Sequence, residues 1–249
     1  IAASKDTEMT SLAEKAGADG INVAGICCTG NEVLMRHGIP LAGNFMQQEL
    51  AVITGAVEAV IVDVQCIMPA LGALSDCFHT KFISTSPKAK FPGATHIEFH
   101  EEKAYDIAKD IVRMAVENYR FRRPNQVQIP DDKMECMVGF STEAILKALG
   151  GTPDPLLEAI KSGSVKGIAG VVGCNNARVT QDEGIISIIR ELISNDVLVV
   201  VTGCAAHASG KHGYLTPEMM ASAGAGLREV CEAIGIPPVL HLGSCVDNS

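Results

Sequence analysis

The sequence predicts an α/β fold built on parallel sheets, and three observations lead to this class. Apolar runs typical of buried strands alternate with segments of helical character along the whole chain. Apolar residues make up 47% of the chain, but only 4% are aromatic and none is Trp. Small aliphatic side chains must therefore fill the core, which suits close packing of helices on sheets. The length of 249 residues is enough for one large domain or two smaller ones.

The first half of the chain carries the alternation clearly. Its expected elements are a helix at 7–17, a strand at 20–26, a helix at 44–57, strands at 58–64, 80–86 and 95–99, and a helix at 101–118. Gly17 ends the first helix, and the helix at 101–118 is amphipathic. The run EAVIVDV at 58–64 has a continuous apolar centre, AVIV, as in a buried parallel strand.

A polar segment at 121–134 contains two prolines and no periodicity, so we expect a connector there. After it come helices at 141–149 and 154–162, a strand at 165–173, a helix at 184–196, a strand at 197–203, a helix at 216–234 and a strand at 237–243. We therefore expect two Rossmann-like parallel-sheet domains, at 1–120 and 135–249. The first should be incomplete at its N-terminus and the second at its C-terminus, as in a segment of a longer polypeptide.

Charge and composition exclude several functions. The net charge is −9 and no basic block is present, so a nucleic-acid partner is not expected. No apolar run reaches membrane-spanning length, and the first residues do not read as a secretion signal. The nine cysteines are an odd number in a chain that we expect to be cytoplasmic. Reduced thiols, available for metal binding, catalysis or burial, are expected rather than disulfides.

Cysteines follow the expected strands at one end. The residues concerned are Cys28 after 20–26, Cys66 after 58–64, Cys174 after 165–173, Cys204 after 197–203 and Cys245 after 237–243. Ligands of open α/β sheets bind beyond the carboxyl ends of the strands, so five thiols there are expected to converge between the two domains. Core packing explains any single cysteine well, but it does not explain five equivalent positions.

The ligand types point to a particular class of metal site. None of the spacings is that of a CxxC knuckle, which disfavours a zinc ribbon. Five thiolates also exceed a tetrahedral zinc site. Soft sulfur ligands in this number suit an iron–sulfur cluster enlarged by another metal.

Five motifs carry a resemblance to a known family. They are GICCTGNEVLMRHG (25–38), VDVQCIMPAL (62–71), GVVGCNNARV (170–179), VTGCAAHASGK (201–211) and HLGSCVDNS (241–249). Together they resemble the catalytic subunit of nickel–iron carbon monoxide dehydrogenase, over nearly the whole chain. The resemblance implies reversible oxidation of CO with water to CO2, two protons and two electrons.

The resemblance also implies roles for the cysteines. The cofactor would be a cluster of nickel, iron and sulfide in which one iron lies outside a distorted cubane. Cys28 would bind that iron, Cys245 would bind nickel, and both would count as catalytic. Each of Cys66, Cys174 and Cys204 would bind a cubane iron. The role of Cys27, next to a ligand, stays open.

Parts of the family's machinery are absent from this sequence. Residues 1–26 contain no histidine that could complete the outlying iron, and the acid–base lysine is expected beyond residue 249. Further 4Fe-4S clusters are expected only in an N-terminal region outside the chain. We therefore expect the segment alone to be inactive. The resemblance implies a homodimer and a ferredoxin-like electron carrier; whether an acetyl-CoA synthase subunit binds stays open.

Two other hypotheses about the function remain open. A hybrid-cluster, hydroxylamine reductase-like protein would use similar thiolates without nickel. A nucleotide- or metabolite-binding α/β module would use the cysteines only for packing. Against this module, GCAAHASGK at 203–211 fails the spacing of a phosphate loop, and no G-x-G-x-x-G follows a strand.

Overall fold

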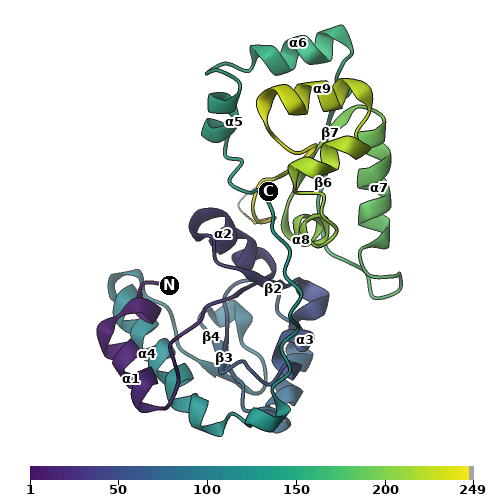
Figure 1. Cartoon of the computed structure of the whole chain (residues 1–249). Coiled ribbons are helices and arrows are strands. Elements are labelled where there is room, and N and C mark those ends of the chain that lie inside the picture. The colour runs from purple at the N-terminus through teal and green to yellow at the C-terminus, as the bar shows by residue number, and fades with distance from the viewer. Residues whose placement is uncertain (247–249) are drawn as a thin grey trace. The chain divides into compact units, whose positions relative to one another are not determined.

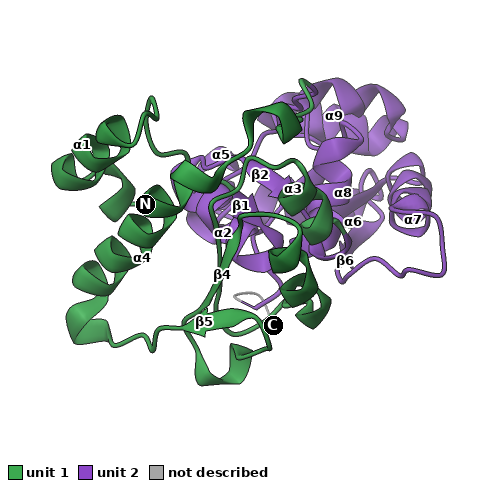
Figure 2. Ribbon diagram, turned by 90° about the horizontal axis from the view of Figure 1, so that it is seen from below, with its two compact units in different colours: residues 1–24, 47–131 green, residues 25–46, 132–249 purple. Residues whose placement is uncertain are grey.

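The computed structural model describes residues 1–246 of the chain. They form two compact units, each built from two stretches of sequence: 1–24 with 47–131, and 25–46 with the residues from 132 on (Figure 2). The first is unit 1 and the second is unit 2. The division into domains at 121–134 stays a prediction, because a compact unit need not be an independently folding domain.

A parallel sheet of three strands forms the centre of unit 1 (Figure 1). Its strands are β3 (Ala59–Val62), β4 (Lys81–Ser84) and β5 (Ala94–His96), in that order. The helices of this unit are α1 (Thr7–Lys15), α3 (Gln48–Ile53) and α4 (Ala104–Asn118). Apolar side chains of strands, helices and loops form its core: Val52, Val62, Leu71, Phe82, Ala89 and Phe91. This is the parallel arrangement that the alternating pattern predicts.

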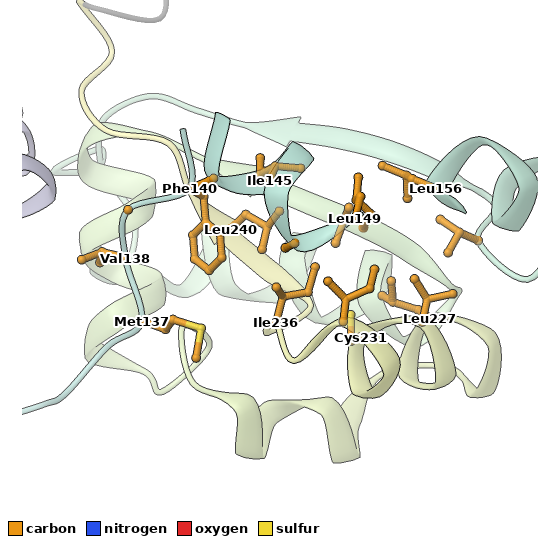
Figure 3. Close-up of a pocket in the computed structure, with 17 residues that line it drawn as sticks. Met137, Val138, Phe140, Ile145, Leu149, Leu156, Leu227, Cys231, Ile236 and Leu240 are labelled. Atoms are coloured by element: carbon orange, nitrogen blue, oxygen red, sulfur yellow. The ribbon is translucent and has the colours of Figure 1, made fainter. Parts of the chain in front are cut away.

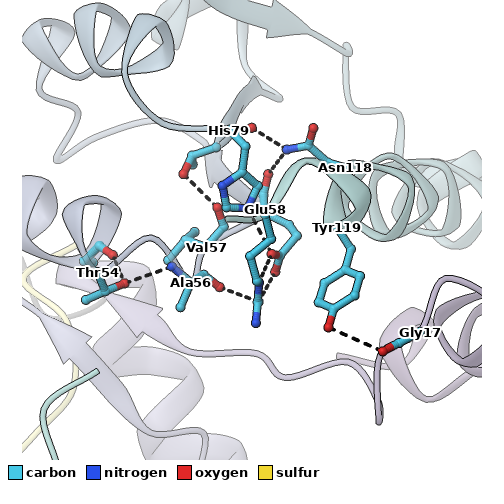
Figure 4. A network of polar contacts seen from close by, with 11 residues as sticks. Gly17, Thr54, Ala56, Val57, Glu58, His79, Asn118 and Tyr119 are labelled. Carbon is cyan, nitrogen blue, oxygen red and sulfur yellow. Dashed lines mark hydrogen bonds and ion pairs between the residues drawn. The ribbon is translucent and has the colours of Figure 1, made fainter. Parts of the chain in front are cut away.

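A polar network joins the edges of unit 1 (Figure 4). The guanidinium of Arg122 donates to both carboxylate oxygens of Glu58 at 2.8 Å, and His79 Nε2 lies 3.1 Å from Glu58 Oε1. Asn118 at the end of α4 donates to the carbonyl oxygens of Glu58 and His79. The segment after α4 is therefore anchored to the start of β3, and Arg122 is occupied by an ion pair.

Unit 2 contains two parallel sheets among its described residues. A small one pairs β1 (Gly25–Ile26) with β2 (Leu41–Gly43), and a larger one has the order β6 (Gly167–Val171), β7 (Val197–Val201), β8 (Val239–His241). Its helices are α2 (Cys27–His37), α5 (Thr142–Ala148), α6 (Asp154–Ser162), α7 (Glu183–Ser194), α8 (Gly203–Lys211) and α9 (Ala225–Ile234). The core lies between β6–β8 and these helices, with Ile189, Ile193, Val199 and Leu227 fully buried.

An apolar cavity of about 230 Å³ lies in unit 2 (Figure 3). Its walls come from the 137–149 segment on one side and from α9 and β8 on the other. Phe140, Leu149, Leu240 and Cys231 are among the lining side chains.

The parallel α/β class is confirmed, but several local expectations are wrong. The strand expected at 20–26 is reduced to β1, and the next residues form helix α2. Residues 203–211, for which no helix was expected, form helix α8. The helix expected at 216–234 is divided into a short 3₁₀ helix (Pro217–Ser222) and α9, with Gly224 between them. No helix within residues 1–246 is both long enough and apolar enough to cross a membrane.

Candidate metal centre

Helix α2 begins with the two adjacent cysteines Cys27 and Cys28. Cys27 has a φ of 57°, a left-handed conformation that L-residues rarely adopt. The helix start is pressed onto β1, because a Cβ atom on Gly25 would overlap the backbone of Gly30. This close approach leaves Cys28 only 5% exposed in the first turn of the helix.

Helix α8 begins in a similar way, directly after β7. Thr202 occupies its N-cap position, Gly203 has a φ of 56°, and Cys204 follows with 2% exposure. The N-terminal end of a helix carries partial positive charge, which favours the thiolate form of a cysteine in the first turn. Cys28 and Cys204 both have this position.

Cys245 lies in the turn after β8 and approaches the start of α8. The hydroxyl oxygen of Thr202 is 3.3 Å from its sulfur. A Cβ atom on Gly203 would stand 2.5 Å from Cys245 Sγ and 3.6 Å from Cys28 Sγ. The sulfurs of Cys28 and Cys245, far apart in sequence, therefore converge on the space that glycine leaves empty.

Backbone hydrogen bonds hold the turn of Cys245 against both helices. The N–H of Gly203 donates to the carbonyl of Gly243 at 3.0 Å. The N–H of Ser244, a residue that is 1% exposed, donates to Glu32 Oε1 on α2 at 2.6 Å. The turn is thus fixed to α8 on one side and to α2 on the other.

Cys174 lies in an exposed loop after β6. The neighbouring Asn175 makes a reciprocal pair with Asp182: its amide donates to Asp182 Oδ1, and the Asp182 N–H donates to Asn175 Oδ1, both at 2.9 Å. Asp182 also forms an ion pair with Lys211 at the end of α8. Burial by itself would raise the pKa of Asp182, but hydrogen bonds and the charge of Lys211 outweigh it and lower the pKa. The carboxylate therefore braces the loop of Cys174 against α8.

Cys66 belongs to unit 1, where it follows β3. Its φ of 57° is left-handed, like that of Cys27. Its carbonyl oxygen accepts a hydrogen bond of 2.5 Å from Gln48 Nε2, and its side chain is half-buried. Strained backbone of this kind costs about 1–3 kcal/mol and concentrates at functional positions.

The donor set fits an iron–sulfur cluster that contains a second metal. Thiolates suit both iron and nickel, and Gly203 leaves room beside two of them. Within residues 1–246, no three His, Cys, Asp or Glu side chains gather around a single metal ion. In a cluster, by contrast, each thiolate binds a different metal atom, so the sulfurs stand apart by the width of the cluster. Binding of one cluster by Cys28, Cys66, Cys174, Cys204 and Cys245 stays a prediction, which the convergence of Cys28 and Cys245 supports.

Two further cysteines are held in the thiol form, which binds metals poorly. Burial, with a smaller contribution from Glu232, raises the pKa of Cys231 to about 12, and burial also raises the pKa of Cys136. Cys77 is exposed. Two histidines near the site, His207 and His241, have pKa values lowered to about 4, mainly by burial.

Sequence reasoning did not identify the hydrogen bonds that polar residues make around the thiols. Thr202, Asn31, Glu32 and His241 all contact the turns or helix starts that carry cysteines. Predicting a helix over 27–37 that ends at Gly38 would have placed Asn31 one turn after Cys27. The last three residues of the HLGSCVDNS motif lie outside the described residues.

Comparison with known proteins gives a family match over the full length. The Prismane/CO dehydrogenase family profile matches residues 1–249. Carbon monoxide dehydrogenase 1 of Methanosarcina mazei is 66% identical over 100% of this chain and 40% of its own length. Carbon monoxide dehydrogenase 1 of Carboxydothermus hydrogenoformans is 49% identical over 97% of this chain and 40% of its own. The chain thus spans about 40% of the length of these curated relatives.

Solved structures give the same result. A Ni-free crystal structure of carbon monoxide dehydrogenase from Thermococcus sp. AM4 has a TM-score of 0.95 and 55% identity, covering 99% of this chain and 39% of that one. Carbon monoxide dehydrogenase IV from Carboxydothermus hydrogenoformans has a TM-score of 0.92 and 52% identity, covering 99% of this chain and 41% of that one.

Proposed function

Because this chain belongs to the Prismane/CO dehydrogenase family, we propose that it is the cluster-binding part of a nickel–iron carbon monoxide dehydrogenase. The whole enzyme would interconvert CO and water with CO2, two protons and two electrons. The observation that carries the proposal is the convergence of Cys28 Sγ and Cys245 Sγ beside Gly203. In this reading Cys245 holds nickel and Cys28 holds the iron outside the cubane, which would make them the ligands nearest the chemistry.

The remaining ligands would be Cys66, Cys174 and Cys204, one for each iron of the cubane. When bound, the cluster supplies the redox chemistry and the activation of water. The chain's own residues supply positions and a dry environment. Cys28 and Cys204 are almost fully buried, and small side chains such as Ala205, Ala206 and Ala208 pack around the start of α8.

The reaction determines the kinds of partner. Two electrons leave the site for each CO oxidised, so an electron carrier of the ferredoxin type is proposed. A homodimeric whole protein in the cytoplasm is also proposed. Two of the similar proteins are named as combined with acetyl-CoA synthase; such an association of this chain remains a proposal.

A protein with a nickel-free hybrid cluster is the main competing hypothesis, since it would use similar thiolates. The relatives that match at 66% and 49% identity are named carbon monoxide dehydrogenases, which favours the nickel enzyme. The metabolite-binding module is disfavoured because packing alone does not require two thiols to meet at a glycine.

The test is anaerobic purification of the full-length protein, with counts of nickel, iron and sulfide and an assay of CO-dependent dye reduction. Nickel together with CO oxidation supports the proposal. Iron and sulfide without nickel would support the hybrid cluster instead, and a colourless, folded protein without iron would support the metabolite-binding module.

A further inference from the structure

His241 is the last residue of β8 and is 1% exposed. Its Nδ1 atom accepts a hydrogen bond from the N–H of Gly243 at 2.9 Å, so the ring proton must lie on Nε2. Nε2 stands 2.8 Å from Oδ1 of Asn31 on α2. The partners therefore assign one tautomer, in which His241 donates to Asn31. Burial, which outweighs the opposing charge of Glu32, lowers the pKa of His241 to about 4 and keeps the ring neutral.

Asn31 is fully buried and its amide orientation is equally fixed. Its Nδ2 group donates to the carbonyl oxygen of Cys27 at 2.7 Å, which leaves Oδ1 as the acceptor for His241. Cys27 is the residue with the left-handed backbone at the start of α2. The Asn31 amide therefore fixes the strained Cys27 peptide, which precedes Cys28. The orientation of this amide is in turn fixed by His241 of β8.

His241 also contacts the turn that carries the second thiol, Cys245. The N–H of Gly243, which donates to His241 Nδ1, belongs to the turn that leads to Cys245. A single chain of hydrogen bonds thus runs from the Cys27 carbonyl through Asn31 and His241 to Gly243. Each end of this chain lies within two residues of Cys28 or Cys245, whose sulfurs converge at Gly203.

We propose that Asn31 and His241 are positioning residues that set the separation of the Cys28 and Cys245 sulfurs. The inference rests on the proposed function, because it treats these two thiols as ligands of the outlying iron and of nickel. If these thiols hold the two metals, their separation would set the spacing available to the metals. Asn31 and His241 act through backbone groups next to these thiols, the Cys27 carbonyl and the Gly243 N–H. Such supporting contacts are worth about 10–100-fold in metal affinity or activity.

The experiment uses the anaerobically produced full-length protein. Asn31→Leu removes both hydrogen bonds of the amide at nearly constant volume, and His241→Phe removes those of the ring. Asn118→Leu is the matched control, since Asn118 is a similarly buried asparagine (2% exposed) whose amide bonds only the carbonyls of Glu58 and His79. Nickel and iron content, the electron paramagnetic resonance spectrum of the reduced cluster, and CO oxidation are measured.

The proposal expects Asn31→Leu and His241→Phe to lose nickel or shift the cluster spectrum, with activity lowered about 10–100-fold. Iron content should stay at the level of Asn118→Leu. The double variant should be no worse than the poorer single one, because both break the same chain of bonds. His241→Gln keeps a donor near the position of Nε2 but lacks the acceptor at Nδ1, so it should recover part of the nickel.

A spectrum and nickel content unchanged in Asn31→Leu, or effects that add in the double variant, would overturn the proposal. If Asn31→Leu fails to fold, the comparison of His241→Phe with His241→Gln still tests the proposal. Equal nickel content and equal spectra in these two variants would also overturn it. If the wild-type protein has iron and sulfide but no nickel and no CO oxidation, the proposed function fails. The spectrum and iron content of that cluster still report on the positioning pair.

Discussion

A Cβ atom on Gly203 would stand 2.5 Å from the sulfur of Cys245, closer than any real Cβ contact allows. The glycine also has a φ of 56°, where an L-residue is strained. Gly203→Ala should therefore displace Cys245, and we expect nickel content and CO oxidation of the full-length protein to fall at least tenfold.

Gly213→Ala is the matched control for this substitution. Gly213 has a φ of 78°, but nothing lies within 4 Å of its Cβ position. Both variants pay the backbone strain of about 1–2 kcal/mol, and only Gly203→Ala meets the sulfur. Equal nickel content in the two variants would show that Gly203 has no role at the metal site.

Cys204 and Cys231 provide a second contrast, because both are buried cysteines of unit 2. Cys204 begins α8, whereas Cys231 lies on α9 with its pKa raised to about 12, so it stays a thiol. We expect Cys204→Ala to lose iron, as counted by metal analysis. Cys231→Ala should keep its iron and show only reduced stability. Normal iron content in Cys204→Ala would remove it from the ligand set.

The sequence alone was sufficient to predict the parallel sheets and the positions of the thiols, because apolar runs and strand ends are local patterns. It did not predict α2 or α8. The cysteines and glycines at their starts have weak helical propensity, and these helices form because their first turns pack on neighbouring strands. The close approach of Gly203 to Cys245, for example, is a tertiary contact that no local pattern encodes.

The supporting polar residues were missed for a related reason. Asn31 and His241 are 210 positions apart, and nothing in either neighbourhood indicates that the other is its partner. The thiols could be proposed as ligands because metal chemistry restricts the residue types that can bind a metal. Hydrogen-bonding partners are much less restricted.

Asp182 should make the loop of Cys174 sensitive to acid. Its pKa is lowered in the folded protein, so it stabilises the fold at pH values above the ordinary carboxyl pKa of about 3.9. That stabilisation is lost as the pH falls through the lowered pKa. We expect Asp182→Asn to reduce hydrogen-exchange protection of residues 172–194 in metal-free protein at pH 6, by about 1–3 kcal/mol.

The difference between wild type and Asp182→Asn should shrink below the ordinary carboxyl pKa and disappear once the pH is below the lowered pKa of Asp182, where the wild-type carboxyl is protonated. A difference that persists unchanged at that pH would mean that the charge of Asp182 does not brace the loop.

The ion pair of Glu58 with Arg122 should stabilise unit 1. The pair is bidentate and mostly buried, with side chains 19% and 26% exposed. We expect Glu58→Gln to lower the protection of amides in β3 and β4 by about 1–2 kcal/mol, read by hydrogen exchange. Glu8→Gln breaks the exposed contacts of Glu8 with Lys109 and Arg113 and should leave protection of its own helix α1 unchanged. Similar losses in both variants would contradict the account.

The most direct test of the central claim is the nickel content of the full-length protein, measured for wild type and for Cys245→Ala after anaerobic purification. We predict that the wild type holds nickel together with iron and sulfide, and that Cys245→Ala loses nickel while retaining most of the iron. Absence of nickel from the wild type, or equal nickel in both proteins, would contradict the assignment of these thiols to a nickel–iron–sulfur cluster.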